Sequence, residues 1–203
     1  MTDDARLYAP SAARNRDAIY AVLGHHLPSH GLVLEIASGS GEHTAHFAQY
    51  SAPDLIFQPS DPDSNARASI DAWSATSGLS NIRPAMALDA EAQIWPITNA
   101  EAVVCINMIH ISPWSATIGL MRGAGRIMSA HGLLYLYGPY RRDGRHTAPS
   151  NEAFDQDLRR RNPTWGVRDL EAVAALATEN GFTPPTIIEM PANNLSLVFT
   201  RSR

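Results

Sequence analysis

The stretch Leu32-Val33-Leu34-Glu35-Ile36-Ala37-Ser38-Gly39-Ser40-Gly41 combines a short apolar run with a turn that contains two glycines. A short apolar run bounded by glycine is typical of a buried strand that leads into a tight turn. Because glycine has no Cβ, Gly39 and Gly41 let the backbone turn sharply and approach a bound molecule closely. The stretch therefore predicts the first strand of an open α/β sheet, with a ligand-binding turn at its carboxyl end.

Outward from this stretch, apolar strands alternate with amphipathic helices along most of the chain. We expect helices over residues 11–27, around 45–48, and over 65–75, 114–128 and 168–180. We expect strands near residues 32–36, 55–57, 83–87, 102–106, 133–137, 186–190 and 195–200. In the fourth helix, Trp114, Ile118, Met121 and Met128 are expected to form the buried face.

The connection between the last two strands, Pro-Ala-Asn-Asn, is too short for a parallel crossover. These strands are therefore predicted to form an antiparallel hairpin. The complete pattern predicts an α/β protein with a Rossmann-like, mostly parallel seven-stranded sheet, a C-terminal antiparallel hairpin and helices on both faces. We find no linker or internal repeat, so residues 1–203 are predicted to form one domain.

The composition excludes several classes of protein. The formal net charge of −4 gives no indication of a nucleic-acid or membrane partner. The chain has no membrane-spanning apolar run, no secretory signal at its start and one cysteine, Cys105, so we expect a cytoplasmic protein. All 16 basic residues are arginine. The absence of lysine excludes a Walker-type phosphate loop, a Schiff-base enzyme and the Tyr-x-x-x-Lys pair of short-chain dehydrogenases.

The residues around the turn favour one adenosine-containing ligand over another. Asp61 stands 20 residues after Gly41, the spacing at which a carboxylate accepts hydrogen bonds from ribose. A dinucleotide-binding turn has a third glycine, whereas here Glu42 follows and would repel a pyrophosphate at a helix N-terminus. S-adenosylmethionine carries no phosphate, and Glu42 could face its ammonium or sulfonium group. The turn therefore favours S-adenosylmethionine.

Motifs along nearly the whole chain point to one family. They are Arg14-Asn15, residues 34–43, Gln58-Pro59-Ser60-Asp61, residues 107–114, Gly138-Pro139-Tyr140, Ser150-Asn151, Phe154-Asp155 and residues 161–169. In these motifs the chain resembles domain-of-unknown-function family 938, the group of methyltransferase-like protein 26. The resemblance implies a class I S-adenosylmethionine-dependent methyltransferase fold and leaves the substrate open.

The resemblance also implies a cofactor site, formed by Glu35, Ala37, Ser38, Gly39, Gly41, Asp61 and Asp89. Glu35 would orient the methionine moiety, Asp61 would hold the ribose hydroxyls, and Asp89 would lie near the adenine amino group. Ala37 stands where many class I enzymes have their first glycine. The structural alternatives are that Glu35 accepts backbone N–H groups, that Asp61 caps the turn before Pro62, and that Asp89 is an ordinary loop carboxylate.

The catalytic candidates follow the strands at residues 102–106 and 133–137. His110 is the candidate general base, Asn107 a positioning group, Tyr140 a second lining residue and Trp114 an aromatic wall. A hydroxyl or ammonium acceptor would need such a base, whereas a carboxylate or thiolate acceptor would not. The alternative is that His110 is a hydrogen-bonded structural residue.

The polar segment 141–167 interrupts the alternation and is predicted to be a substrate-side insertion or lid. Residues 141–168 contain seven arginines and four acidic residues. These arginines either recognise an anionic substrate or form local ion pairs on a solvated surface. The substrate-binding candidates in and beside this segment are Asn151, Phe154, Asp155, Trp165 and Arg168.

The leading hypothesis is an S-adenosylmethionine-dependent methyltransferase that acts on a small molecule, with an oxygen, nitrogen or sulfur acceptor. The alternatives are a non-catalytic S-adenosylmethionine-binding module or partner scaffold and, less favoured, an NAD-dependent oxidoreductase. A nucleic-acid methyltransferase is disfavoured because Asn107-Met108-Ile109-His110 replaces the Asn/Asp-Pro-Pro-aromatic motif. Histidines such as His43 and His46 lack the acidic and cysteine neighbours of a metal site, so no metal is expected. The oligomeric state is left open.

Overall fold

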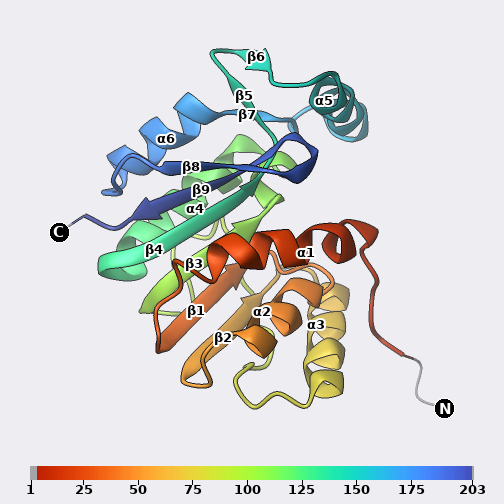
Figure 1. Cartoon of the computed structure of the whole chain (residues 1–203), viewed down its shortest axis with the longest axis vertical. Helices are drawn as coiled ribbons and strands as arrows, with labels where there is room; N and C mark the ends of the chain where they lie inside the picture. Colours follow the sequence, from red (N-terminus) through yellow and green to blue (C-terminus); the bar gives the residue numbers. More distant parts are fainter. Residues whose placement is uncertain (1–3, 203) are drawn as a thin grey trace.

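The computed structural model describes residues 4–202 and contains a central six-stranded sheet in the order β2-β1-β3-β4-β9-β8 (Figure 1). The strands are β1 (Gly31–Ile36), β2 (Leu55–Ser60), β3 (Ala100–Ile106), β4 (Met128–Gly138), β8 (Thr186–Met190) and β9 (Asn194–Thr200). β1 to β4 pair in parallel, whereas β9 pairs antiparallel with both β4 and β8. The predicted α/β sheet with a C-terminal hairpin is confirmed.

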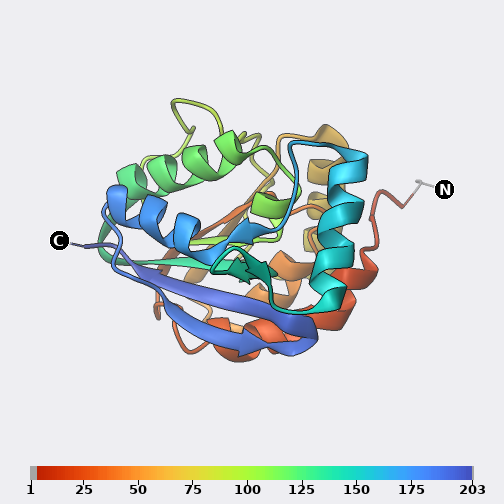
Figure 2. The ribbon, with the colours of Figure 1, turned by 90° about the horizontal axis from the view of Figure 1, so that it is seen from above.

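Within residues 4–202, six α-helices accompany these strands. They are α1 (Pro10–Leu23), α2 (Glu42–Tyr50), α3 (Ser64–Ser77), α4 (Trp114–Ile127), α5 (Pro149–Arg161) and α6 (Leu170–Glu179). Figure 2 shows α1 on one face of the sheet and α4 with α6 on the other. No helix among residues 4–202 has the length and apolar character needed to cross a lipid bilayer.

From Ala102 to Ile106, alternation along β3 builds the core on both faces of the sheet. Ala102 and Val104 are buried in the cluster that includes Ile19 of α1. Val103 and Cys105 point to the opposite face and belong to the cluster that includes Leu120 of α4. Successive strand residues point to opposite faces, and a central parallel strand has both faces covered. This explains why residues 102–106 of β3 are all apolar.

The expected strand at 83–87 is wrong, which reduces the sheet from seven strands to six. The segment lies beside β2 and forms isolated bridges, with Arg83 N donating to Phe57 O at 2.9 Å and Met86 N donating to Pro59 O at 3.0 Å. The next bond of a regular parallel ladder would need an N–H on Pro59 of β2, which proline lacks, and Ala85 N donates instead to Asp71 Oδ1 at 2.7 Å.

Two helix predictions also need correction. α1 ends at Leu23, and a short turn, rather than further helix, carries the chain to Leu27. In α4, Ile118 is 40% exposed, because the buried face is formed instead by residues such as Thr117, Leu120 and Met121. Met128 is buried, but it is the first residue of β4 rather than a helical residue.

The segment predicted as a polar interruption has its own secondary structure. β5 (Tyr140–Arg142), β6 (Arg145–His146) and β7 (Arg168–Asp169) form a small sheet in the order β6-β5-β7. α5 lies between β6 and β7 in the chain, and Figure 2 shows it on the same side of the molecule as the start of α1. This segment therefore forms a separate structural layer beside the central sheet.

Candidate functional site

The turn between β1 and α2 adopts left-handed backbone conformations that favour glycine. Gly39 has φ +58°, Gly41 has φ +91°, and Ala37 has φ +55°. A Cβ on Gly41 would lie 2.7 Å from Ile70 Cα, whereas a Cβ on Gly39 would have no neighbour within 4 Å. Gly41 is therefore required for packing against α3, and Gly39 faces open space. The conformation of Ala37 explains why glycine suits its position, since the left-handed region costs a non-glycine residue about 1 kcal/mol or more.

Asp61 is held beside this turn at the end of β2. Its Oδ2 accepts a hydrogen bond from Gly39 N at 3.0 Å, and its Oδ1 accepts one from Asp63 N at 3.0 Å. The side chain is 7% exposed. Because each carboxylate oxygen has a second lone pair, Asp61 retains acceptor capacity beyond these two bonds. Asp61 therefore caps the turn before Pro62, as the structural alternative predicts, and its carboxylate can still accept further hydrogen bonds.

A first cleft opens at this edge of the sheet, with a volume of about 310 Å³. Three of the proposed cofactor residues, Ala37, Asp61 and Asp89, line it. Its other walls come from Ile36, Pro62, Leu88, Ala90, Glu91, Met108, Ile111, Ser112, Pro113, Ala116 and Trp165. Sequence analysis missed most of these, although Leu88 and Ala90 directly flank Asp89. The volume lies at the lower end of the range for small-molecule pockets.

Glu35 lies behind the turn and does not line the first cleft. Its side chain is 3% exposed and accepts a hydrogen bond from the Thr44 hydroxyl. Burial raises the pKa of Glu35 from 4.5 to about 7, against the opposing effect of the hydrogen bonds from Thr44 and Ser38. The structure therefore gives Glu35 a supporting position at the base of the turn.

Glu42 does not face the first cleft. Its Oε2 accepts hydrogen bonds from Ala9 N at 2.6 Å and from Ser40 Oγ at 2.9 Å. The suggestion that it meets a cofactor ammonium or sulfonium group is not supported by this position. Instead, Glu42 connects the turn to the segment that precedes α1.

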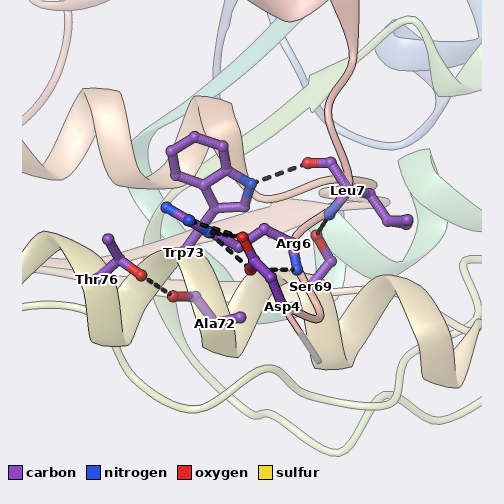
Figure 3. Close-up of polar contacts among 7 residues, drawn as sticks. All are labelled: Asp4, Arg6, Leu7, Ser69, Ala72, Trp73 and Thr76. Atoms are coloured by element: carbon purple, nitrogen blue, oxygen red, sulfur yellow. Dashed lines mark hydrogen bonds and ion pairs between the residues drawn. The ribbon is translucent and has the colours of Figure 1, made fainter. Parts of the chain in front are cut away.

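The segment before α1 runs along α3 and contacts the same turn (Figure 3). Leu7 N donates to Ser69 Oγ at 2.8 Å, and Trp73 Nε1 donates to Leu7 O at 2.9 Å. Ser69 Oγ in turn donates to Ser40 O at 2.7 Å. Hydrogen bonds from α3 and from the segment before α1 therefore both stabilise the turn.

A second cleft of about 770 Å³ lies beside the first, and both are lined by Ile111. α1 and the ends of β3 and β4 contribute Ser11, Arg14, Asn15, Ala18, Asn107, Tyr137 and Pro139, and α5 with the β8–β9 connection contributes Ser150, Asn151, Phe154 and residues 191–194. Sequence analysis quoted Arg14-Asn15 as a family motif without assigning it to a site. The residues next to Arg14 and Asn15 in the sequence do not indicate that the two line a cleft, because α1 reaches this cleft only through tertiary packing.

The proposed acceptor-side residues divide into three groups. Asn107, Asn151 and Phe154 line the second cleft. Trp165 lines the first. The remaining candidates, His110, Tyr140, Trp114, Asp155 and Arg168, line neither cleft.

His110 and Tyr140 are packed inside the protein. Both are 0% exposed, and their rings meet edge to face with centroids 5.0 Å apart. Neither ring nitrogen of His110 has a hydrogen-bond partner, and burial lowers its pKa to about 3. A general base must come within hydrogen-bond reach of the acceptor. This geometry therefore does not support His110 as the base or Tyr140 as a lining residue.

Most arginines of the 141–168 segment are engaged in structural contacts. Arg141 pairs with Asp169 at 2.8 Å, and Arg142 pairs with Glu189 at 2.8 Å. Arg168 donates to Ile109 O at 2.9 Å and lies over the ring of Trp114. The geometry favours local ion pairs over a substrate-binding arginine cluster.

Asp155 is also used within the fold. Its Oδ1 accepts from Val167 N at 2.6 Å, and its Oδ2 accepts from Arg159 Nε at 3.0 Å. The bond from Val167 thus holds α5 against the chain that leads into β7, whereas Arg159 lies one turn further along α5 itself. The two α2 histidines likewise have protein partners, with His43 Nε2 2.8 Å from Asn15 Oδ1 and His46 Nε2 3.1 Å from Asp17 Oδ1. Among residues 4–202, no three His, Cys, Asp or Glu side chains are grouped to hold a metal.

A comparison with known protein families matches the chain to one family. Residues 6–201 match the family described as Protein of unknown function (DUF938). The chain belongs to this family. The match spans both clefts, so the residues described above are part of the family's shared domain.

Solved structures similar to this member of the DUF938 family include several methyltransferases. An O-methyltransferase family protein from Burkholderia thailandensis has a TM-score of 0.81 at 15% identity, over 95% of this chain and 56% of that chain. The apo form of the S-adenosylmethionine-dependent methyltransferase SibL has a TM-score of 0.77 at 18% identity, with the same coverages of 95% and 56%. Human N-acetylserotonin methyltransferase in complex with SAM has a TM-score of 0.68 at 13% identity, over 91% and 53%. The chain thus spans little more than half of each neighbour, and it has their Rossmann-like class I methyltransferase fold.

Proposed function

We propose that this DUF938 protein is an S-adenosylmethionine-dependent methyltransferase that acts on a small molecule. The observation that carries the proposal is the first cleft, where the turn after β1 and the Asp61 carboxylate meet at the carboxyl ends of parallel strands. Ligands of open α/β sheets bind at this edge. The fold that the chain shares with solved methyltransferases, such as SibL, supports the same assignment.

The residues of the first cleft fit the cofactor. Asp61 has the remaining lone pairs to accept both ribose hydroxyls. Asp89, at the rim, can accept from an adenine amino group, and Trp165 supplies an aromatic surface. Open space in front of Gly39 leaves room for the methionine moiety. When bound, the cofactor supplies a methyl group on a positively charged sulfur, and the protein's task is to align it and exclude water.

The second cleft is the proposed acceptor site because it shares Ile111 with the first. α5 forms part of its wall through Ser150, Asn151 and Phe154. We therefore retain the 141–167 segment as a substrate-side layer and propose that it covers the acceptor. Asn151 ties this layer to the hairpin, since its Nδ2 donates to Asn193 O at 2.9 Å.

Calorimetric titration with S-adenosylmethionine, S-adenosylhomocysteine and NAD tests the cofactor assignment. The two adenosyl ligands should bind and NAD should not. In a Gly39→Ala variant the added Cβ would enter the space assigned to the methionine moiety, so affinity should fall about tenfold or more. Gly78→Ala is the matched control, because Gly78 has φ +67° and likewise no neighbour within 4 Å of a Cβ, but caps α3 away from the cleft.

Three outcomes would count against the proposal. Binding of NAD alone would favour an oxidoreductase. Equal loss of affinity in the Gly39→Ala and Gly78→Ala variants would show that the turn does not contact the cofactor. Cofactor binding without methyl transfer to any component of a metabolite extract would favour the non-catalytic module.

A further inference from the structure

The second cleft has a single charged side chain. Its lining consists of Ser11, Arg14, Asn15, Ala18, Asn107, Ile111, Tyr137, Pro139, Ser150, Asn151, Phe154, Pro191, Ala192, Asn193 and Asn194. Arg14 is the charged residue, and no Asp, Glu, His or Cys among residues 4–202 lines this cleft. A cation would therefore find no countercharge here, whereas an anion would find one.

Arg14 differs from the arginines of the 141–168 segment that form ion pairs with carboxylates. Arg141, Arg142 and Arg159 each have a carboxylate partner within 3.0 Å. Among residues 4–202, no carboxylate lies within the 4.0 Å salt-bridge distance of the Arg14 guanidinium. The guanidinium fork matches a carboxylate in geometry and charge. Arg14 is therefore available to pair with an anionic group inside the cleft.

The neutral groups of the cleft are held in place and provide no strong base. Asn15 Oδ1 is 2.8 Å from His43 Nε2, and burial lowers the pKa of His43 to about 4, so the neutral imidazole can donate this bond. Burial raises the pKa of Tyr137, with hydrogen bonds from Asn15 and Asn194 opposing the shift, so its phenol stays protonated at neutral pH. An acceptor that must lose a proton would find no side chain here to take it.

A nucleophile that is already ionised would pair with Arg14 and would need no base from the cleft. Carboxylic acids have pKa values near 4, so they are fully ionised at neutral pH and need no general base. We infer that the methyl acceptor is a small organic carboxylate, recognised by Arg14 and methylated on oxygen to give a methyl ester. This inference rests on the proposed function.

The step balances without a proton transfer. A carboxylate oxygen forms a bond to the methyl carbon while the methyl–sulfur bond breaks, and the electron pair of that bond stays on sulfur. The products are a neutral ester and neutral S-adenosylhomocysteine. Asn107 and Phe154, which line the same cleft, would orient the acceptor and shield it from water.

Binding of three matched probes tests the recognition half of the inference. Benzoate, benzamide and benzylamine differ mainly in charge, and each is titrated by NMR into protein saturated with S-adenosylhomocysteine. Benzoate should bind about tenfold or more tightly than the other two, and Arg14→Gln should abolish that preference without changing S-adenosylhomocysteine affinity. Arg83→Gln is the control, because Arg83 is an exposed arginine beside β2 and lines neither cleft. Equal or weaker binding of benzoate, or an unchanged preference in Arg14→Gln, would overturn the inference.

Methyl transfer from tritiated S-adenosylmethionine to a metabolite extract tests the chemistry. A methyl ester releases volatile tritiated methanol in mild alkali, whereas N-methyl, S-methyl and ether products do not. We expect alkali-labile label with wild type and Arg83→Gln, and at least a tenfold loss with Arg14→Gln. Alkali-stable label would overturn the carboxylate inference and leave the methyltransferase assignment standing. Failure to bind either adenosyl ligand would refute the methyltransferase assignment itself.

Discussion

Replacing Glu35 with glutamine should change how the stability of this protein depends on pH. The carboxyl is 3% exposed, and burial raises its pKa from 4.5 to about 7. In the unfolded chain the same group ionises near 4.5. At a pH between 4.5 and about 7, the Glu35 carboxyl is therefore protonated in the folded protein and ionised in the unfolded chain.

The magnitude follows from the difference between the two pKa values. Because the folded pKa is raised, the stability contributed by the neutral carboxyl is fully present below pH 4.5 and declines as pH rises toward 7. One pKa unit corresponds to about 1.4 kcal/mol, so the full decline is about 3 kcal/mol. Above about pH 8 the carboxyl is ionised in both states, and the decline stops.

The assay is urea denaturation of wild type and Glu35→Gln at intervals between pH 4.5 and 8.5. Because glutamine does not titrate, the stability of the variant relative to wild type should increase by about 3 kcal/mol across this range and then level off. Other ionisable groups are common to both proteins and cancel in the difference.

Thr44→Val provides a directional control. The Thr44 hydroxyl lowers the pKa of Glu35 by hydrogen bonding, so its removal should raise that pKa further. The upper end of the titration should then move to higher pH. A difference between Glu35→Gln and wild type that stays constant from pH 4.5 to 8.5 would refute the buried, raised-pKa carboxyl.

Three further predictions concern the turn, the ribose carboxylate and the α5 layer. Gly41→Ala should destabilise the fold by about 2–4 kcal/mol in urea titration, because the new Cβ would lie 2.7 Å from Ile70 Cα; a loss below 1 kcal/mol would contradict this packing. Asp61→Asn should weaken S-adenosylmethionine binding about tenfold or more in calorimetry, because a charged acceptor of ribose hydroxyls is lost; unchanged affinity would remove Asp61 from the site. Asp155→Asn should lower the free energy of unfolding at pH 7 by about 1.5–3 kcal/mol, because the hydrogen bonds from Arg159 and Val167 lose their charged acceptor; an unchanged denaturation midpoint would argue against that role.

Several features of the site could be predicted because their cause is local. The glycines of the β1 turn, confirmed here in left-handed conformations, reflect backbone freedom that the neighbouring residues alone reveal. Asp61 directly follows β2, so its place at a strand end was readable from the chain, whereas Asp89 follows an apolar run that does not form a strand. Both line the first cleft, whereas their contacts with a cofactor stay predictions.

Other features depended on packing between distant segments. His110 follows a strand in the position of a cleft residue, yet the chain after it folds back and buries its ring against Tyr140. The charge of the 141–168 segment was visible, but whether its arginines pair with protein carboxylates depends on partners such as Glu189, 47 residues from Arg142. Spacing in sequence does not encode such distances.

By itself, the sequence determined the alternating strands and helices, the antiparallel ending and the glycine-containing turn after β1. Hydrophobic period, connection length and glycine placement are local properties with direct backbone consequences. Only the tertiary structure decided that the 83–87 segment forms isolated bridges with β2 rather than a regular strand, and that α1 places Arg14 in the second cleft. Both outcomes depend on which distant segments pack against each other in the folded protein. A short stretch such as the turn after β1 does not contain that information.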